Sequence, residues 1–280
     1  MKNLKNKVAA ITGAGSGIGR MLALQLAAES CHLAISDINE AGLKETKKII
    51  GNGVKVSTHI VDVSKQDHVI RFAREAEAHH GGIDIIINNA GVALGDFLET
   101  VPIEDFKWLM GINFWGVVYG TMAFLPYLRK RPEGHIVNIS SINGIVPNPN
   151  NGPYQSSKYA VRGYTETLIQ EMKGTNIGVS CVHPGGIKTN IARNTKVNNT
   201  YYSISREQAA ALYDKEVFRT SAEKAANVII DGIKKNKQRI MVGYDAKVLD
   251  ILMRLFPKMI VNTSAKVAKR MARKYAETKI

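Results

Sequence analysis

Tyr154 and Lys158 are the two residues in this 280-residue sequence whose types and spacing point most directly to chemistry. They stand four positions apart in a stretch with helical periodicity, so their side chains lie on one face of the expected helix. A free tyrosine has a pKa of about 10 and is a poor base at neutral pH, but an ammonium within about 4–6 Å favours the phenolate. Tyr154 can then take a proton from a substrate alcohol, or give one to a carbonyl in the reverse direction.

Two polar residues upstream can complete such a site. Ser141 follows a strand-like run and can donate a hydrogen bond to the reacting oxygen. Asn113 lies inside Trp108–Leu128, a stretch of 21 residues without a charge, where a side-chain amide is costly to bury unless it has partners. Each feature also has a structural interpretation, because a Tyr-x-x-x-Lys spacing arises often by chance and Ser141 can be a turn residue at a strand end.

A glycine-rich run, Thr12-Gly13-Ala14-Gly15-Ser16-Gly17-Ile18-Gly19, lies between the first strand-like run and the first helical stretch. Glycines there let the backbone approach a pyrophosphate, and the following helix offers free N–H groups and the positive end of its dipole. Tight turns also use glycine for purely structural reasons, but the strand before this run and the helix after it are the context that a dinucleotide site requires. The expected contacts are Gly13, Ser16, Gly17, Ile18 and Gly19.

Acidic residues stand at the ends of the next two strand-like runs. They are candidate contacts to the adenosine part of the dinucleotide, and the first of them distinguishes NAD from NADP. Asp37 can accept hydrogen bonds from the adenosine ribose hydroxyls. A 2′-phosphate would meet like charge there, and no Lys or Arg stands within Gly13–Gly17 or at position 38, so NAD is favoured over NADP. Asp62 can accept from the adenine amino group while the Val63 backbone lines the edge of the ring. Both carboxylates can instead cap the helices that follow them.

These motifs together resemble the classical short-chain dehydrogenase/reductase (SDR) family. Each motif is loose alone, but their joint order and spacing are highly specific, and the resemblance covers about residues 5–245. Besides the glycine run it rests on Asn88-Asn89-Ala90-Gly91, on Ser141 thirteen residues before Tyr154, on Tyr154-Gln155-Ser156-Ser157-Lys158 and on Pro184-Gly185-Gly186-Ile187-Lys188-Thr189.

The resemblance implies roles that the spacing alone does not define. It implies that Asn113 anchors a water linking Lys158 to solvent for proton relay, and that Lys158 binds the nicotinamide ribose hydroxyls. Asn89 would close the floor of the cofactor cleft, while the Ile187 backbone and the Thr189 hydroxyl would hold the nicotinamide carboxamide. The segment with these last two residues can also be an ordinary Pro-Gly turn with a helix cap.

The elements that must position these residues follow a regular alternation of strand-like and helical stretches. Several strand-like runs are continuously apolar, as expected where helices cover both faces of a sheet. The alternation predicts an α/β fold, a Rossmann-type doubly wound parallel sheet of seven strands with right-handed crossovers. The expected strands are Val8–Thr12, Leu33–Asp37, Val54–Val61, Ile83–Asn88, His135–Ser140, Ile177–His183 and Arg239–Val242, and the expected helices span about 17–29, 39–50, 64–79, 103–130, 154–173 and 222–235.

Substrate specificity is expected from three segments near the catalytic residues. They are Val92–Phe97, the proline-stiffened turn Asn143–Asn151, and the stretch 191–218 within an irregular region of about 188–221 that is long enough to act as a lid. Apolar and aromatic side chains in the lid predict an apolar pocket, although they can instead face the core from short lid helices. These residues are Ile191, Val197, Tyr201, Tyr202, Leu212, Tyr213 and Phe218.

Composition excludes several classes of protein. With 45% hydrophobic and 22% charged residues the chain is a globular protein rather than a disordered one. Two cysteines, Cys31 and Cys181, imply no disulfide framework and fit a reducing compartment, and the N-terminus lacks the long apolar run of a signal peptide, so a cytoplasmic location is expected. Trp108–Leu128 is long enough for a membrane span, but its Asn, Gly and Pro residues favour a buried core or interface helix. The histidines form no ligand-spaced cluster, so no metal site is expected.

The C-terminal tail carries half of the net charge of +14, with eight Lys or Arg and one Glu from Arg254 to Ile280. An apolar stripe of Val267, Ala268, Met271, Ala272, Tyr275 and Ala276 faces a basic one, which is compatible with lying on an anionic membrane surface. The alternative is a solvated helix that packs on its own subunit or on a neighbour. Nucleic-acid binding is not expected, because aromatic interleaving and a recognition motif are lacking. The expected division is a Rossmann domain over 1–245 and a basic helical extension over 246–280.

The sequence thus predicts an NAD-dependent oxidoreductase that interconverts a secondary alcohol, lipophilic in character, and its ketone. The resemblance also implies a homodimer or homotetramer built on the helices at 103–130 and 154–173. Two other functions stay open at this point. One is a non-catalytic nucleotide-sensing domain of the same fold, and the other is a membrane-peripheral scaffold that acts through its basic tail.

Overall fold

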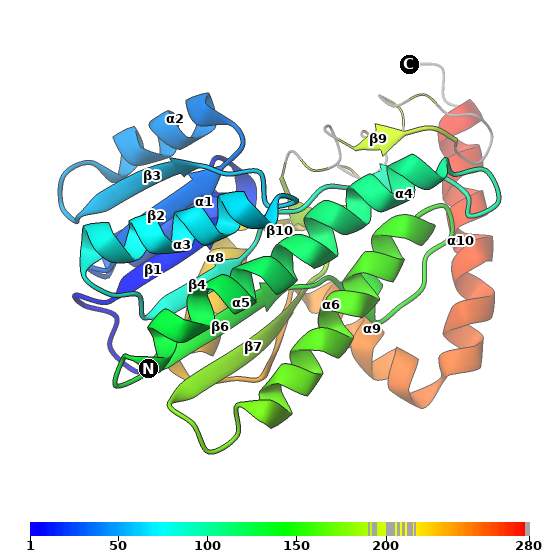
Figure 1. Cartoon of the computed structure of the whole chain (residues 1–280). Coiled ribbons are helices and arrows are strands. Elements are labelled where there is room, and N and C mark those ends of the chain that lie inside the picture. Colours follow the sequence, from blue (N-terminus) through cyan, green and yellow to red (C-terminus); the bar gives the residue numbers. More distant parts are fainter. Residues whose placement is uncertain are drawn as a thin grey trace.

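Seven parallel strands form the central sheet of the protein, seen here in a computed structural model that describes residues 1–189, 191, 195–199, 205, 208, 211, 215 and 217–277 (Figure 1). The strand order is β11-β7-β6-β4-β1-β2-β3, so the predicted doubly wound sheet is confirmed. The strands are β1 (Val8–Thr12), β2 (His32–Asp37), β3 (Val56–Ile60), β4 (Ile85–Asn88), β6 (Gly134–Ile139), β7 (Ile177–Pro184) and β11 (Arg239–Val242).

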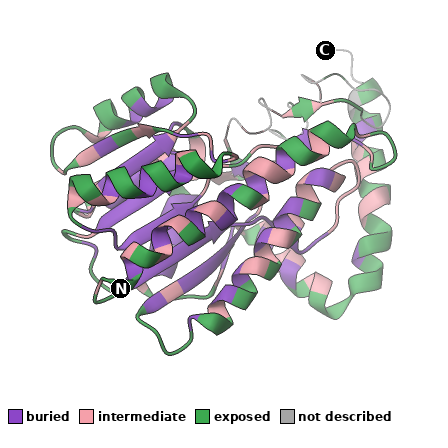
Figure 2. Ribbon diagram, viewed as in Figure 1, coloured by how far each residue is buried: buried purple, intermediate pink, exposed green. Residues whose placement is uncertain are grey.

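Helices cover both faces of the sheet, which explains why its central strands, such as β1 and β4, are apolar and buried along most of their length (Figure 2). On β1, Ala9 and Ile11 belong to one buried cluster and Val8 and Ala10 to the other, because successive side chains point to opposite faces. The first cluster includes side chains of α1 (Gly17–Ala28), α2 (Glu40–Ile50) and α8 (Ala222–Lys234). The second includes side chains of α3 (Gln66–His80), α5 (Gly116–Arg129) and α6 (Gly152–Glu171).

The strand order reverses direction between β1 and β4. The chain moves outward from β1 to β2 and β3, and then returns to the other side of β1 to build β4, β6, β7 and β11. In open parallel sheets a crevice forms at such a switch point, outside the carboxyl ends of the strands, and ligands bind there. The glycine-rich turn after β1 and the segment Asn89–Gly91 after β4 both begin at this point.

The helix expected over 103–130 is interrupted. α4 (Ile103–Met110) and α5 are joined by η1, a π-helical turn over Gly111–Trp115 that contains Asn113. Gly120 lets α5 lie close to β4, because a Cβ there would stand 2.0 Å from the Asn88 side-chain oxygen. By length and composition Ile103–Arg129 could cross a membrane, and 44% of its most apolar window is buried in the protein.

Short strands tie the substrate-side segments to the body of the protein. β5 (Leu94–Gly95) pairs with β9 (Lys196–Val197), and β8 (Ile187–Lys188) pairs with β10 (Thr220–Ser221), so the stretch expected to act as a lid is held near both ends. These two pairings were not predicted from the sequence. The lid aromatics Tyr201, Tyr202 and Tyr213, together with Leu212, lie outside the described residues.

Two helices follow β11, α9 (Tyr244–Leu255) and α10 (Pro257–Glu277), and Figure 1 shows α10 at one edge of the molecule. Ala246 of α9 and Ile260 of α10 are buried against Ile142 of the 3₁₀ turn η2 (Ile142–Gly144). Further along α10, Met271 is half-buried and Ala272 is buried, so this part of the apolar stripe faces the protein. The exposed side of α10 carries basic residues such as Lys266 and Arg270.

Candidate active site

The glycine-rich turn connects β1 to the N-terminus of α1. Gly13 has a φ of +69°, and a Cβ there would lie 2.8 Å from the Cα of Ala90. A Cβ on Gly19 would lie 2.1 Å from the Gly13 carbonyl oxygen, so neither position has room for a side chain. Ser16 is the exposed N-cap of α1, and its side chain makes no capping hydrogen bond. The turn therefore exposes helical N–H groups at the switch point and fits the pyrophosphate of a dinucleotide.

Asn89 fixes this turn against the end of β4. Its side-chain amide donates to the carbonyl oxygens of Thr12 at 2.9 Å and of Gly13 at 3.1 Å. In return, the Thr12 hydroxyl accepts from the backbone N–H groups of Asn89 and Ala90, at 3.0 and 3.1 Å. Asn89 therefore joins the ends of β1 and β4, the two strands at the switch point.

Asp37 lies at the end of β2 with its carboxylate against the glycine turn. One oxygen accepts from the Gly15 N–H at 2.8 Å and the other from the Asn39 N–H at 2.9 Å. The N-cap of α2 is Asn39 rather than Asp37, so the capping interpretation of this carboxylate is wrong. Arg20, a cation next to the turn that the sequence analysis overlooked, is 2.7 Å from the Glu45 carboxylate. That contact pairs the positive charge of Arg20 with a carboxylate.

Asp62 and Val63 follow β3. One Asp62 oxygen accepts from the backbone N–H of Ser64 at 2.9 Å and from its hydroxyl at 2.7 Å, which closes a turn before α3. The N-cap position of α3 itself is Lys65. Val63 packs against α5, because a Cβ on Gly116 would lie 2.9 Å from the Val63 side chain. Asp62 thus stabilises a turn, and it lies at the same carboxyl edge of the sheet as Asp37.

Ile187 and Thr189 lie across the crevice from the glycine turn. Ile187 is buried in β8, and a Cβ on Gly17 would lie 3.4 Å from the Thr189 methyl group. The Thr189 hydroxyl accepts from the Ile191 N–H at 3.4 Å, a local turn contact. The glycine turn and the segment after β7 therefore approach each other, as the two walls of a cofactor cleft would.

Lys158 is buried in α6 with its ammonium beside the carboxyl end of β6. The Nζ atom donates to the Ile139 carbonyl oxygen at 3.0 Å and lies 5.6 Å from the centre of the Tyr154 ring. Burial lowers the pKa of Lys158 to about 8, because removal from water penalises the charged form. The predicted shared helix face for Tyr154 and Lys158 is present, and Tyr154 is half-buried.

Ser141 follows the last residues of β6 and begins the turn η2. Its hydroxyl oxygen accepts from the Asn143 N–H at 3.1 Å, so the turn interpretation of this residue holds as well. The preceding Ser140 hydroxyl donates to the Lys158 carbonyl oxygen at 2.8 Å. The end of β6 is thereby connected directly to the turn of α6 that carries Lys158.

Asn113 is fully buried in η1, and its side chain has three hydrogen bonds. The oxygen accepts from the Val92 N–H at 2.8 Å, and the amide donates to the Val92 carbonyl at 2.9 Å and to the Ser157 hydroxyl at 3.2 Å. These partners compensate for burying the amide. A Cβ on Gly91 would lie 3.2 Å from the Asn113 oxygen and 3.6 Å from the Lys158 ammonium, so the two side chains share one corner of the site.

Two functional neighbours escaped the sequence analysis. Arg20 was one, and its position directly after Gly19 was the available signal. The other is His183, expected only to end a buried strand, whose Nδ1 lies 3.2 Å from the Ser141 carbonyl oxygen. No spacing rule connects residues 42 positions apart, so this contact had no sequence signal.

Comparisons with known proteins show the family to which the chain belongs. The family model for short chain dehydrogenases matches residues 7–200. SadH of Mycobacterium tuberculosis, which carries the name of an oxidoreductase, is 40% identical over 258 residues, covering 91% of this chain and 92% of SadH. This chain belongs to the short-chain dehydrogenase/reductase family.

Solved SDR structures are similar to this chain in fold, and one of them contains NAD. An SDR from Burkholderia phymatum in complex with NAD has a TM-score of 0.83 and 28% identity, covering 92% of this chain and 96% of that one. Levodione reductase has a TM-score of 0.79 and 26% identity, covering 88% and 99%. The protein is therefore an SDR oxidoreductase with a nucleotide-binding Rossmann fold.

The buried ammonium of Lys158 predicts how the stability of this SDR changes with pH. The folded-state pKa of about 8 lies below the ordinary lysine pKa of 10.5, so between these values the unfolded chain binds more protons and stability rises with pH. Between pH 7 and pH 10 the free energy of unfolding should increase by roughly 2 kcal/mol relative to Lys158→Met. Urea denaturation of both proteins across this range measures the difference. A free energy of unfolding of wild type minus that of Lys158→Met that stays constant or falls from pH 7 to pH 10 would contradict a lowered pKa for Lys158.

Proposed function

We propose that this SDR is an NAD-dependent enzyme that interconverts a secondary alcohol and its ketone. The single observation that supports this most is the Lys158 ammonium, which is buried 5.6 Å from the centre of the Tyr154 ring and beside the carboxyl end of β6. A cation in this position favours the phenolate over the phenol. A structural lysine would gain nothing from such burial, because desolvation of its charge costs stability.

In this proposal Tyr154 is the acid/base. It accepts the hydroxyl proton of the alcohol as the ketone forms, and it returns a proton to the carbonyl oxygen in the reverse reaction. Ser141 donates a hydrogen bond to the same oxygen and holds it beside the phenol. Lys158 lowers the cost of the phenolate and binds the nicotinamide ribose, and Asn113 anchors a water through which protons reach solvent.

The cofactor half of the proposal uses the residues that line the crevice. Bound NAD supplies the hydride acceptor. Asn89 shapes the floor beneath it, Asp37 accepts from its adenosine ribose, and the Ile187 backbone with the Thr189 hydroxyl holds its carboxamide. The pyrophosphate contacts are Gly13, Ser16, Gly17, Ile18 and Gly19, and the adenine contacts are Asp62 and Val63. Preference for NAD is supported by the Asp37 carboxylate beside Gly15 and by the pairing of Arg20 with Glu45.

A lipophilic substrate is proposed from the segments on the substrate side. Asp96, fully buried, accepts from the side chains of Thr100, Asn198 and Asn199, and so holds the segment after β5 against the stretch after β9. This leaves Leu98 68% exposed near the start of α6. The name of levodione reductase indicates that a relative of the same fold reduces a ketone. We propose an apolar alcohol or ketone for this chain on that basis.

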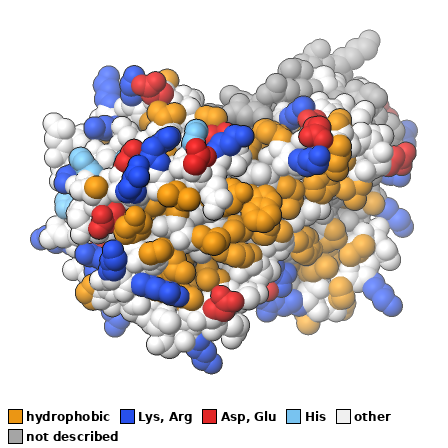
Figure 3. Space-filling model, viewed as in Figure 1, with side chains coloured by type: hydrophobic (Ala, Val, Ile, Leu, Met, Phe, Trp, Pro, Cys, Tyr) orange, Lys and Arg blue, Asp and Glu red, His pale blue; other side chains and the backbone are white. Residues whose placement is uncertain are grey.

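A homodimer or homotetramer is proposed from the apolar face formed by α4, α5 and α6. Figure 3 shows hydrophobic side chains gathered on the face where these helices lie. Trp108, Trp115 and Met122 are 42%, 47% and 59% exposed there, although they are large apolar residues. Contiguous apolar surface of this kind is typical of a subunit interface, and a twofold axis would bury it against a second copy.

We also propose peripheral membrane contact through the tail, but through a different surface of α10 from the apolar stripe. Because Ala268, Met271 and Ala272 face the protein at least in part, the packing alternative accounts for that portion of the stripe. The surface available to lipid is instead the basic side of α10 together with Leu255 and Phe256, which are 65% and 52% exposed at the α9–α10 junction. A cytoplasmic enzyme of this kind would bind anionic lipid reversibly.

Tyr154→Phe tests the catalytic assignment. Removing the hydroxyl should lower kcat by about a thousandfold or more, because the general acid/base is lost, while NADH affinity stays within about twofold. The assay follows NAD reduction with a panel of secondary alcohols that includes cyclohexanol and 2-decanol, and NADH binding by fluorescence. Tyr159→Phe, five positions along in α6, is the matched control and should keep its activity. Equal turnover by Tyr154→Phe and wild type would overturn the assignment.

Asp37→Ser tests the cofactor preference. The substitution removes the carboxylate that would repel a 2′-phosphate, so kcat/KM with NADP should rise relative to NAD by about tenfold or more. Both cofactors are compared at fixed alcohol concentration, with Asp67→Ser on the exposed side of α3 as the control. Wild-type protein that prefers NADP would contradict the proposal directly.

Two surface variants test the partners and act as controls for each other. Met122→Glu places a charge on the apolar face and should shift the protein to monomers in light scattering, without changing its sedimentation with phosphatidylglycerol vesicles. Lys266→Glu combined with Arg270→Glu should reduce vesicle binding about tenfold or more and leave the oligomer intact. A monomeric wild type would contradict the interface, and wild type that does not bind these vesicles would contradict the membrane contact.

A further inference from the structure

His183, next to the last residue of β7, is fully buried directly behind Ser141. Its Nδ1 lies 3.2 Å from the Ser141 backbone carbonyl oxygen. Because a carbonyl oxygen only accepts, Nδ1 carries the proton and donates. Burial lowers the pKa of His183 to about 4, so the ring is neutral at physiological pH and this tautomer persists.

The contact occurs where regular strand pairing stops. The ladder between β6 and β7 ends at Ile139 and Val182, and the Ser140 N–H donates to the Val182 carbonyl at 2.8 Å. At Ser141 the backbone leaves the sheet, and its carbonyl accepts from the Gly144 N–H at 2.9 Å and from His183. The imidazole therefore supplies a hydrogen bond from β7 at the first residue beyond the ladder.

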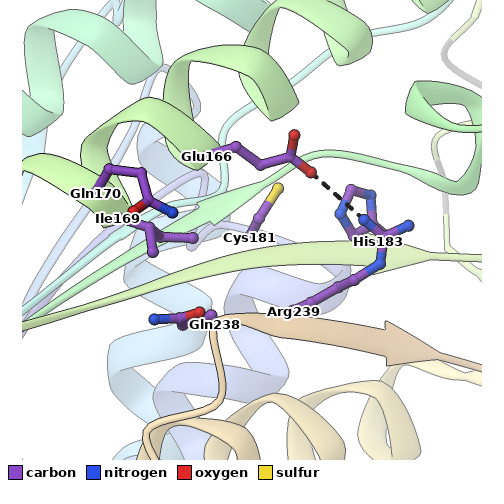
Figure 4. A pocket seen from close by; sticks show the side chains of 7 residues that line it. All are labelled: Glu166, Ile169, Gln170, Cys181, His183, Gln238 and Arg239. Carbon is purple, nitrogen blue, oxygen red and sulfur yellow. Dashed lines mark hydrogen bonds and ion pairs between the residues drawn. The ribbon is translucent and has the colours of Figure 1, made fainter. Parts of the chain in front are cut away.

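The rest of the His183 ring points to a role that packing does not explain. His183 lines a hollow of about 280 Å³ together with Glu166, Cys181 and Arg239 (Figure 4). Among the described residues, its Nε2 is buried without a hydrogen-bond partner. A buried acceptor without a partner lowers stability, and a leucine would fill the strand end without that cost. The contribution of the imidazole is thus the bond from Nδ1.

We propose that His183 is a positioning residue for Ser141, an inference that rests on the proposed role of Ser141 as hydrogen-bond donor to the reacting oxygen. By donating to the Ser141 carbonyl oxygen, His183 fixes the orientation of the Ser141 backbone. The direction of the Ser141 side chain, and so the place of its hydroxyl, follows from that orientation. Arg239 and Glu166, 3.5 Å apart, flank the same hollow and form an ion pair, so their charges largely offset each other beside the ring. Small displacements of a reacting group lower rates strongly, so loss of this bond should reduce kcat rather than cofactor binding.

Three variants at position 183 separate positioning from packing. His183→Leu keeps an apolar volume and removes both nitrogens, and it should lower kcat about tenfold or more while NADH affinity stays within about twofold. His183→Asn carries an N–H donor near the place of Nδ1 and should restore kcat to within about threefold of wild type. His183→Gln carries its amide near the place of Nε2 and should resemble His183→Leu. Cys181→Ala, on the same strand and lining the same hollow, is the matched control and should retain full activity.

A double variant tests whether His183 affects kcat through Ser141. If His183 acts through Ser141, then adding His183→Leu to Ser141→Ala should change kcat by less than about twofold, because the group being positioned is already absent. Full additivity in this background, or equal kcat for His183→Leu and wild type, would overturn the positioning role. Ser141→Ala with wild-type kcat would instead overturn the proposed role of Ser141, so the two failures are distinguishable. Thermal unfolding of each variant verifies that the fold is retained.

Discussion

The buried ammonium of Lys158 is the constraint on which the arrangement at the carboxyl edge of the sheet depends. A cation removed from water needs hydrogen-bond acceptors at fixed positions, and Lys158 finds one in the Ile139 carbonyl at the end of β6. Ser140 then joins that strand end to the same turn of α6. Gly91 lies beside the ammonium, and a Cβ there would be 3.6 Å from Lys158 Nζ and 3.2 Å from the Asn113 oxygen. In the proposed function, the cofactor hydroxyls and the Tyr154 phenol are the groups that this cation serves. Stability is lost to keep this charge in place, as is usual at functional sites.

Much of this architecture could be predicted because it follows from local patterns in the sequence. Continuous apolar runs specify strands buried on both faces, and the strand order follows from short right-handed crossovers between them. The glycine turn was predictable since Gly13 and Gly19 occupy places where a Cβ would collide with neighbouring backbone. Tyr154 and Lys158 were predictable because helical spacing alone brings their side chains together. Apart from the approach of Gly13 to Ala90, these features depend on contacts between residues close in sequence, or on a periodicity that one sequence displays.

What could not be predicted depends on contacts between distant segments. The π-helical turn holds the Asn113 amide where it bonds to Val92 and Ser157, and helical periodicity does not reveal this. The bond from His183 to Ser141 joins two strand ends, and neither sequence nor spacing predicts it. The apolar stripe of α10 was visible, but an amphipathic pattern does not specify whether protein or lipid covers it. Only the tertiary arrangement, with Ala272 buried, answers that question for this part of the helix.

A crystal structure of the full-length protein with NADH and a bound ketone tests the central claim most directly. The account predicts that the Lys158 ammonium lies within hydrogen-bond distance of the nicotinamide ribose hydroxyls. It also predicts that the hydroxyls of Tyr154 and Ser141 both contact the ketone oxygen above the nicotinamide C4. A complex in which Lys158 contacts only the Ile139 carbonyl, and in which the Tyr154 hydroxyl points away from C4, would contradict it.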